Sequence, residues 1–160
     1  MKNLKDLFET QLKDLYSVES QLVEALPKMV KKSHHPGLQK AFEEHLQETQ
    51  KHKEKLEKIC SELGIKPEGK ESLAMKAMIA EAEQFVEKAA NDNVRDAGII
   101  AHAQHVEHYE ISGYGALIEY AKDLGHDAIA DRLLRTLDQE RSADDELKQL
   151  AKSRINQEAQ

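Results

Sequence analysis

"AQHVEHYEISGYGAL", residues 103–117, places acidic side chains where a helix is expected to bury apolar ones. At helical spacing, one stripe through this stretch and the turn after it holds Ala103, Val106, Glu107, Glu110, Tyr114, Leu117 and Ala121. Two carboxylates therefore lie on the face predicted to be buried. The fold must supply a counter-charge for them.

The composition is typical of long helices joined by few connections. Of the 160 residues, 33% are charged and 39% are hydrophobic, and only 7 are Gly and 3 are Pro. This length predicts one domain over residues 1–155. The last residues, 156–160, are expected to fray.

Charge and hydropathy exclude several classes of partner. The formal net charge is −7 and the basic residues are scattered, which argues against nucleic acid. No apolar run approaches the roughly 20 residues of a membrane span, and the charged, amphipathic N-terminal segment does not resemble a signal peptide. The single Cys60 excludes an internal disulfide, so we expect a cytoplasmic protein with no membrane partner.

Breakers and caps divide the chain into helices. They predict long helices over about 3–33, 36–64, 94–124 and 127–155, and a shorter helix over about 72–90. Pro36 suits a first helical turn, Gly64 and Gly125 suit helix ends, and Asp127 is expected as an N-cap. Pro27 should bend the first helix without breaking it.

Two long helices, a crossover with its own helix, and two more long helices follow one another along the chain. This order predicts an all-α protein, a ferritin-like four-helix bundle with one extra crossover helix. Periodicity alone would equally allow another bundle, because helix count and loop length do not determine which helices are neighbours. The polar residues in the stripes carry the argument further.

Every long helix has an acid within or beside its apolar stripe. An unpaired buried carboxylate costs several kcal/mol, and a cluster of carboxylates adds mutual repulsion. Two divalent cations would neutralise such a cluster, and residues three or four apart on one helix can reach the same site. The predicted metal ligands are Glu19, Glu48, His52, Glu107, Glu110, Glu140 and Asp144.

Four segments resemble the YciF-type bacterial stress proteins of the ferritin-like superfamily. They are "DLYSVESQL" (14–22), "HLQETQKHKEKLE" (45–57), "VEHYEISGYGAL" (106–117) and "TLDQERSADDELKQLA" (136–151). The resemblance implies a di-iron-type bundle with an extra crossover helix, a homodimer, and a link to osmotic or oxidative stress.

The sequence departs from the ferritin and rubrerythrin pattern, which places His three residues after the Glu on the second and fourth helices. Here Lys51 follows Glu48 at that spacing, and Ala143 follows Glu140. Other side chains on the same faces are able to replace the missing ligands. They are His45, three residues before Glu48, together with His52 and Asp144, each four residues after its glutamate.

Other candidate residues have alternative interpretations. His45 is also consistent with a core histidine that bonds a neighbouring helix. Tyr114 is consistent with a hydrogen-bond donor to a liganding carboxylate or with a packed residue at a boundary. His34, His35, His102, His105 and His108 are expected at the surface, and Cys60 in the core.

These residues favour a redox protein with two divalent ions, iron first and manganese as the alternative. It would oxidise Fe(II) with dioxygen or peroxide, as a ferroxidase or peroxidase-like oxidoreductase. The alternative is a non-catalytic stress-induced bundle that buffers metal or serves as an interaction protein. Storage in a ferritin-like or Dps-like cage is a third option, for which the sequence shows no assembly surface.

Overall fold

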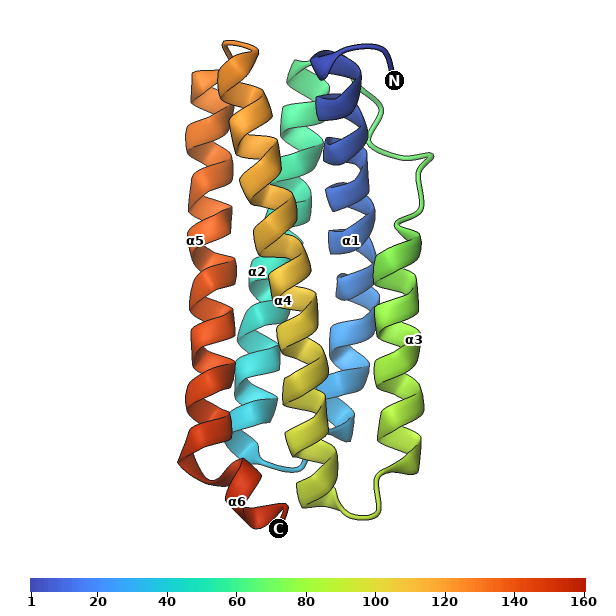
Figure 1. Cartoon of the computed structure of the whole chain (residues 1–160), viewed down its shortest axis with the longest axis vertical. Helices are drawn as coiled ribbons and strands as arrows, with labels where there is room; N and C mark the ends of the chain where they lie inside the picture. Colours follow the sequence, from blue (N-terminus) through green and yellow to red (C-terminus); the bar gives the residue numbers. More distant parts are fainter.

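Helices form most of the molecule, here as a computed structural model (Figure 1). It describes the backbone of residues 1–160 and the side chains of residues 1–153 and 155–160. The elements are α1 Leu4–Lys32, α2 Pro36–Glu62, α3 Leu73–Lys88, α4 Asp92–Asp123, α5 Asp127–Leu150, a π-helical turn η1 Ala151–Ile155, and α6 Asn156–Glu158. All five predicted helices are present, and the described residues contain no strand.

Local capping explains where several helices begin and end. Asn3 and Asn91 each accept a hydrogen bond from a backbone N–H three residues further on, at the start of α1 and of α4. Gly64 and Gly125 have φ of 68° and 77°, the left-handed conformation that ends α2 and α4. The expectation of a helix that continues through Pro27 is confirmed, since α1 extends to Lys32.

Two predicted details at the C-terminal side differ from the structure. Asp127 is not the N-cap, because α5 begins at Asp127 and His126 stands in the cap position. In the first turn the Asp127 carboxylate still favours the positive end of the helix dipole. In the tail predicted to fray, residues 156–158 form a helical turn, and Asn93 Nδ2 donates a 2.9 Å hydrogen bond to the Glu158 carbonyl.

The four long helices surround a common core. Helix α1 lies beside α2 and α4, and α5 lies beside the same two helices. Figure 1 shows that α1 and α5 run in one direction and α2 and α4 in the other, so neighbours are antiparallel. The crossover helix α3 packs on the outside, against α1 and α4, as expected for a four-helix bundle with one long crossover.

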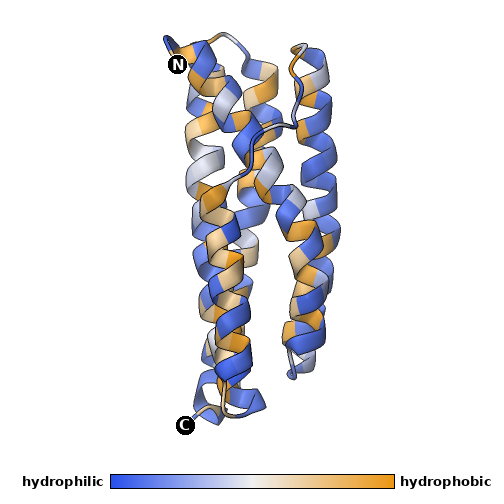
Figure 2. Cartoon of the chain, turned by 90° about the vertical axis from the view of Figure 1, so that its right-hand side faces the viewer, coloured by the Kyte–Doolittle hydropathy of each residue, from blue (hydrophilic) through white to orange (hydrophobic). Residues whose placement is uncertain are grey.

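Hydrophilic and hydrophobic residues alternate around each helix, as amphipathic helices require (Figure 2).

The turn between α1 and α2 is held by a buried carboxylate from α4. Asp96 is 2% exposed, and its two oxygens accept hydrogen bonds from the backbone N–H groups of His34, at 2.9 Å, and His35, at 2.6 Å. This contact ties the end of the first helical hairpin to the third long helix.

The hydrophobic core is divided into two parts along the bundle axis. One cluster draws on residues 8–15 of α1, 56–60 of α2, 114–121 of α4 and 129–137 of α5. The other draws on residues 18–26 of α1, 38–42 of α2, 75–86 of α3, 99–100 of α4, Leu147 and Ile155. Most of the buried acids and histidines lie between these two clusters on α2, α4 and α5, and at their junction on α1. They are Glu19, His45, His52, Glu107, Glu110, Glu140 and Asp144.

Two glycines of α4 give a test of how α3 is docked. A Cβ added at Gly98 would come within 1.8 Å of the Phe85 ring on α3, whereas one added at Gly115 meets no described atom within 4 Å. We expect Gly98→Ala to lower the free energy of unfolding by about 1–3 kcal/mol through overpacking. Gly115→Ala should raise it by about 0.5–1 kcal/mol, because alanine favours the helix. Urea unfolding of both variants measures the difference, and equal stability would contradict this packing of α3.

Candidate metal centre

The buried polar layer contains side chains from all four long helices. They are Glu19 from α1, His45 and His52 from α2, Glu107 and Glu110 from α4, and Glu140 from α5. Each of these side chains is at most 7% exposed. Four carboxyl groups and two imidazoles therefore share the centre of the bundle.

One group of possible ligands lies on the side of His45. One ligand atom from each of His45, Glu107, Glu110 and Glu140 lies within 4.8 Å of the others. His45 Nε2 is 3.1 Å from Glu107 Oε1 and 4.0 Å from Glu140 Oε2. These positions are close enough for a single ion to contact all four side chains.

A second group shares Glu140 with the first. Glu19, His52 and Glu140 also bring their ligand atoms within 4.8 Å of one another. His52 Nδ1 is 2.8 Å from Glu140 Oε1 and 3.6 Å from Glu19 Oε1. The other ring nitrogen, Nε2, lies 3.0 Å from the Gln139 side-chain oxygen, which orients the imidazole with Nδ1 toward the carboxylates.

Several of these buried atoms have no hydrogen-bond partner among the described residues. They are both oxygens of Glu110 and of Glu140, Oε2 of Glu19 and of Glu107, both ring nitrogens of His45, and Nδ1 of His52. A buried carboxylate oxygen without a donor is costly. Oxygen and imidazole atoms facing one small volume match the donors that divalent transition metals prefer. The cluster therefore contains two groups of ligand atoms, each able to hold a metal ion, and the two groups share Glu140.

Two predicted ligands lie outside both groups. The Glu48 side chain is 38% exposed, and its Oε2 is 3.9 Å from His45 Nδ1. Asp144 is buried but turned toward α4, where Gln104 Nε2 donates to it at 3.1 Å, and Lys148 on its own helix forms an ion pair with it. Five of the seven predicted ligands are brought together, and these two are at the edge.

The remaining candidates also have defined places. Tyr114 is fully buried and its hydroxyl donates a hydrogen bond to Glu19, so it contacts the cluster. Cys60 lies in the core, where burial raises its pKa to about 11. His108 is 62% exposed and its Nε2 is 3.4 Å from Asp144.

The sequence interpretation left His45 open and did not identify Gln139. His45 and His52 are seven residues apart, so the two imidazoles lie about 20° from each other around α2. That spacing places both histidines on one face, as the sequence predicts, but it does not show which of them contacts the acids. Gln139 lies next to Glu140 in the sequence, and no local pattern predicts that it contacts a side chain of α2.

Burial and mutual repulsion change the pKa values of the acids. Burial raises the pKa of Glu19, and it raises that of Glu107 to about 7. Burial, together with the charges of Glu140, Glu19 and Glu107, raises the pKa of Glu110 well above its usual value. Burial also opposes ionisation of Glu140, but the His52 and His45 imidazoles lower its pKa. The cluster without metal therefore concentrates negative charge on Glu140.

The histidines carry the balancing charge. Burial opposes the protonated form of His52, but Glu140 and Glu19 outweigh it and raise its pKa to about 10. Burial likewise opposes protonation of His45, and Glu107 raises its pKa well above the usual value. Two imidazolium groups therefore neutralise the carboxylates when no metal is bound.

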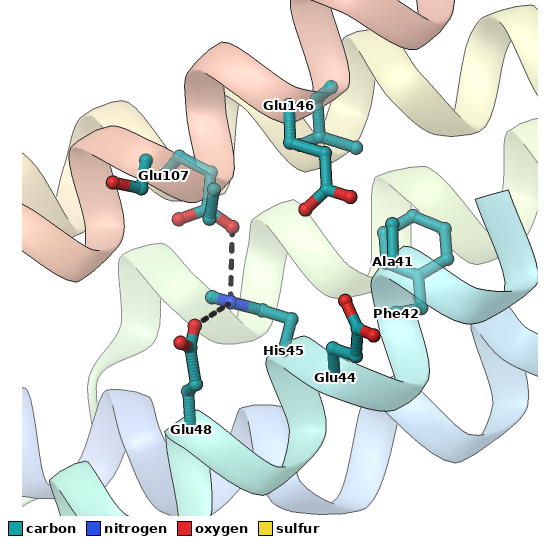
Figure 3. Close-up of a pocket in the computed structure, with 10 residues that line it drawn as sticks. Ala41, Phe42, Glu44, His45, Glu48, Glu107 and Glu146 are labelled. Atoms are coloured by element: carbon teal, nitrogen blue, oxygen red, sulfur yellow. Dashed lines mark ion pairs between the residues drawn. The ribbon is translucent and has the colours of Figure 1, made fainter. Parts of the chain in front are cut away.

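A cavity of about 110 Å³ leads from the surface to His45 and Glu107, between α2 and α5. Figure 3 shows the dashed ion pairs from His45 to Glu107 and to Glu48 beside this cavity. Glu44 of α2 and Glu146 of α5 also line it, and their carboxylates point toward each other across the opening (Figure 3). The cluster is therefore accessible to small solutes from one side.

An all-α bundle of four long helices with an external crossover helix and buried acids and histidines at its centre defines a ferritin-like protein. The chain matches the family described as "Domain of unknown function (DUF892)" over residues 3–160, and it belongs to this family. It is 38% identical over 161 residues to Protein YciF of Escherichia coli (strain K12), covering 100% of this chain and 97% of that protein.

Two solved structures resemble this chain closely. The crystal structure of the E. coli stress protein YciF has a TM-score of 0.93 and 39% sequence identity, covering 98% of this chain and 99% of that one. The structure of YcfI from Rhodopseudomonas palustris has a TM-score of 0.90 and 40% identity, covering 92% and 94%. The predicted fold and the predicted family resemblance are confirmed. No helix within the described residues is both long and apolar enough to cross a membrane.

The stability of the metal-free protein should decrease as pH rises. The pKa of Glu107 rises from 4.5 in the unfolded chain to about 7 in the folded protein, and that of His52 rises from 6.5 to about 10. Between these values the folded protein binds more protons than the unfolded chain does. Both folded-state pKa values are raised, so each group contributes stability that is present at low pH and is lost as pH rises through its folded pKa. The acids with lowered pKa values act in the opposite sense only below about pH 4.5.

We therefore expect the melting temperature in a chelating buffer to fall from about pH 5 to about pH 9. Thermal unfolding followed by circular dichroism measures this. Added divalent metal should weaken or reverse the trend, because metal ligands bind in their deprotonated forms. A melting temperature that climbs over the same range without metal would contradict these protonation states.

Proposed function

We propose that this protein binds two divalent metal ions at the centre of the bundle and oxidises Fe(II) with dioxygen or peroxide during stress. His45, Glu107 and Glu110 would hold one ion, and Glu19 and His52 the other, with Glu140 shared between them. Iron is the first candidate and manganese the second, because the donors combine carboxylates with one imidazole for each ion. The observation that carries the proposal is the buried cluster of carboxylates and imidazoles, in which Glu19 Oε2, Glu107 Oε2 and both oxygens of Glu110 accept no hydrogen bond from a described residue.

Charge supports two ions rather than one. Four carboxylates, from Glu19, Glu107, Glu110 and Glu140, carry four negative charges when all are ionised. Two divalent cations match that charge with both imidazoles neutral. One cation would leave the cluster with excess negative charge, which a site nearly closed to water does not tolerate.

Two Fe(II) ions bound there would supply the two electrons that reduce one peroxide, with two protons, to two waters. The protein's own residues would position and protect this reaction. Gln139 orients His52, and the Tyr114 hydroxyl holds Glu19 in place. The two hydrophobic clusters above and below the layer exclude bulk water from the reacting groups.

The stress assignment rests on the relatives. The E. coli YciF structure is described as that of a stress protein, and we transfer that role to this chain on 39% identity over almost its full length. The buried, unpaired thiol of Cys60 fits a reducing cytoplasm. A homodimer follows from the resemblance alone.

A non-catalytic role is favoured by one observation. His45 and His52 pair with the acids in the absence of metal, so the bundle can exist without an ion. The protein would then be a metal buffer or a structural stress protein. Mixing Fe(II) with the metal-free protein under argon and then adding peroxide distinguishes the roles. Formation of Fe(III) faster than with free Fe(II) supports the oxidase. Binding of Fe(II) without faster oxidation supports the metal buffer.

The stoichiometry of metal binding tests the proposed site directly. We expect two Fe(II), Mn(II) or Co(II) ions per chain at saturation, because two ligand groups share Glu140. Anaerobic titration with elemental analysis after desalting measures this. Saturation at one ion, or at none, would contradict the two-ion site.

Glu110 separates a metal ligand from a structural residue. It is fully buried, and neither of its oxygens accepts a hydrogen bond from a described residue. Glu110→Gln and Glu110→Ala should both weaken metal binding at least about tenfold, since each removes a ligand charge. The metal-free variants should be as stable as the parent or more stable, because loss of a buried carboxyl group that has no hydrogen-bond partner among the described residues offsets the small cavity left by Ala.

Glu119→Gln is the matched control, since Glu119 is exposed on the same helix. It should change neither metal affinity nor stability beyond about 0.5 kcal/mol. A structural Glu110 would give the reverse result. Strong destabilisation of both metal-free Glu110 variants with unchanged metal binding would refute its role as a ligand.

A further inference from the structure

The cavity between α2 and α5 is lined by several acidic side chains. The buried cluster does not need these acids for its own stability. We propose that this cavity is the entry port for divalent cations, and that Glu44 and Glu146 attract the hydrated ion from solvent and pass it by way of Glu48 to His45 and Glu107. This inference rests on the proposed function, because it assigns a route to the ions of that site.

The acids form a graded path from solvent to the cluster. The exposed fraction of the side chain falls from 56% at Glu44 to 38% at Glu48 and 4% at Glu107. Glu146 is exposed on the opposite wall, on α5. A cation moving inward would therefore exchange water for carboxylate oxygens in steps, which lowers the cost of dehydration.

The inner end of the cavity presents buried ligand atoms. Glu107 and His45 both line it, with His45 Nε2 3.1 Å from Glu107 Oε1, and the residues that the structure describes provide no hydrogen bond for Glu107 Oε2. His45 is 7% exposed and Glu107 is 3% exposed. The path thus ends on buried ligand atoms rather than on an apolar wall.

Charge at the outer end favours cations. Glu44 has one basic neighbour, Lys40 at 3.5 Å, and this exposed pair along the helix leaves most of the field at the opening negative. A cleft lined by one sign of charge raises the local concentration of ions of opposite sign and their rate of association. The cavity of about 110 Å³ is several times the roughly 10–15 Å³ that a single water needs, so it has room for several waters.

Further along the bundle axis, beyond His52, the α2–α5 interface carries basic side chains that disfavour cations. Lys55 Nζ donates a 2.7 Å hydrogen bond to Thr136 there, and the positive charges of Arg135 and Arg132 lie close enough to act on Lys55. A second pocket, under α3, has an apolar lining that includes Leu22, Ile79 and Ile99, and no carboxylate. Neither place offers a cation the attraction that the acidic cavity offers.

The test is the rate of Co(II) binding to metal-free protein, followed by stopped-flow visible absorption at about 0.01 M ionic strength. The double variant Glu44→Gln with Glu146→Gln should bind Co(II) about tenfold more slowly than the parent, and the difference should shrink at about 0.5 M salt. The final stoichiometry should stay at two, because neither residue belongs to the ligand groups. A second variant, Ala143→Leu, narrows the cavity without changing charge and should also slow binding.

The control is Glu54→Gln with Asp138→Asn, a pair of exposed acids on the same two helices. Glu54 is ten residues beyond Glu44, about 15 Å along α2. The double control variant removes the same amount of charge as Glu44→Gln with Glu146→Gln, and it should leave the rate of Co(II) binding unchanged. Parent-like rates in both cavity variants, with two ions still bound, would overturn the port and leave the proposed site intact. A parent protein that binds no Co(II) would overturn the proposed function and the port together.

Discussion

Burial of four carboxyl groups at one level of a helical bundle is the constraint on which this structure depends. Each acid alone would favour a helix register that exposes it, so the apolar residues above and below must outweigh that preference. The core does so by dividing into two hydrophobic clusters, one on each side of the polar layer. The long helices follow from this arrangement, since each must reach both clusters and contribute to the layer between them.

Protons and the proposed metal ions would compete for the same negative charge in this layer. Without metal, the imidazolium groups of His45 and His52 pair with Glu107 and Glu140, and the raised pKa of Glu110 keeps its carboxyl neutral. Two divalent ions would replace these protons, because the charge of two dications balances the charge of four ionised carboxylates. Metal affinity and protonation are thus linked in a single equilibrium. The histidines that would bind metal are thus the same groups that pair with the acids when no metal is bound.

The fold could be predicted almost completely from the sequence, because caps such as Pro36 and Gly125 and the apolar stripes are local features that tertiary contacts reinforce. The centre of the site could also be predicted from the sequence, since Glu107 and Glu110 share one face of one helix. Contacts between helices could not be predicted from the sequence. The orientation of Asp144 toward Gln104, for example, depends on the rotation of α5 relative to α4. The same holds for Gln139 and His52, which approach from different helices. Nothing within one helix specifies those rotations.

The departures from the ferritin pattern are physically connected. On α2, Glu48 is rotated by about 60° from His45 and about 40° from His52, so when both imidazoles point inward the carboxylate must lie at the edge. On α5, Ala143 stands where a Glu-x-x-His motif would place an imidazole, and its small side chain lines the cavity instead of filling it. In the proposed site, His45 of the neighbouring helix α2 would take the place of the histidine that the ferritin pattern has on α5, and Ala143 leaves space that forms part of the cavity. The placement of both histidines on α2 therefore connects the position of Glu48, the role proposed for His45 and the access to the cluster.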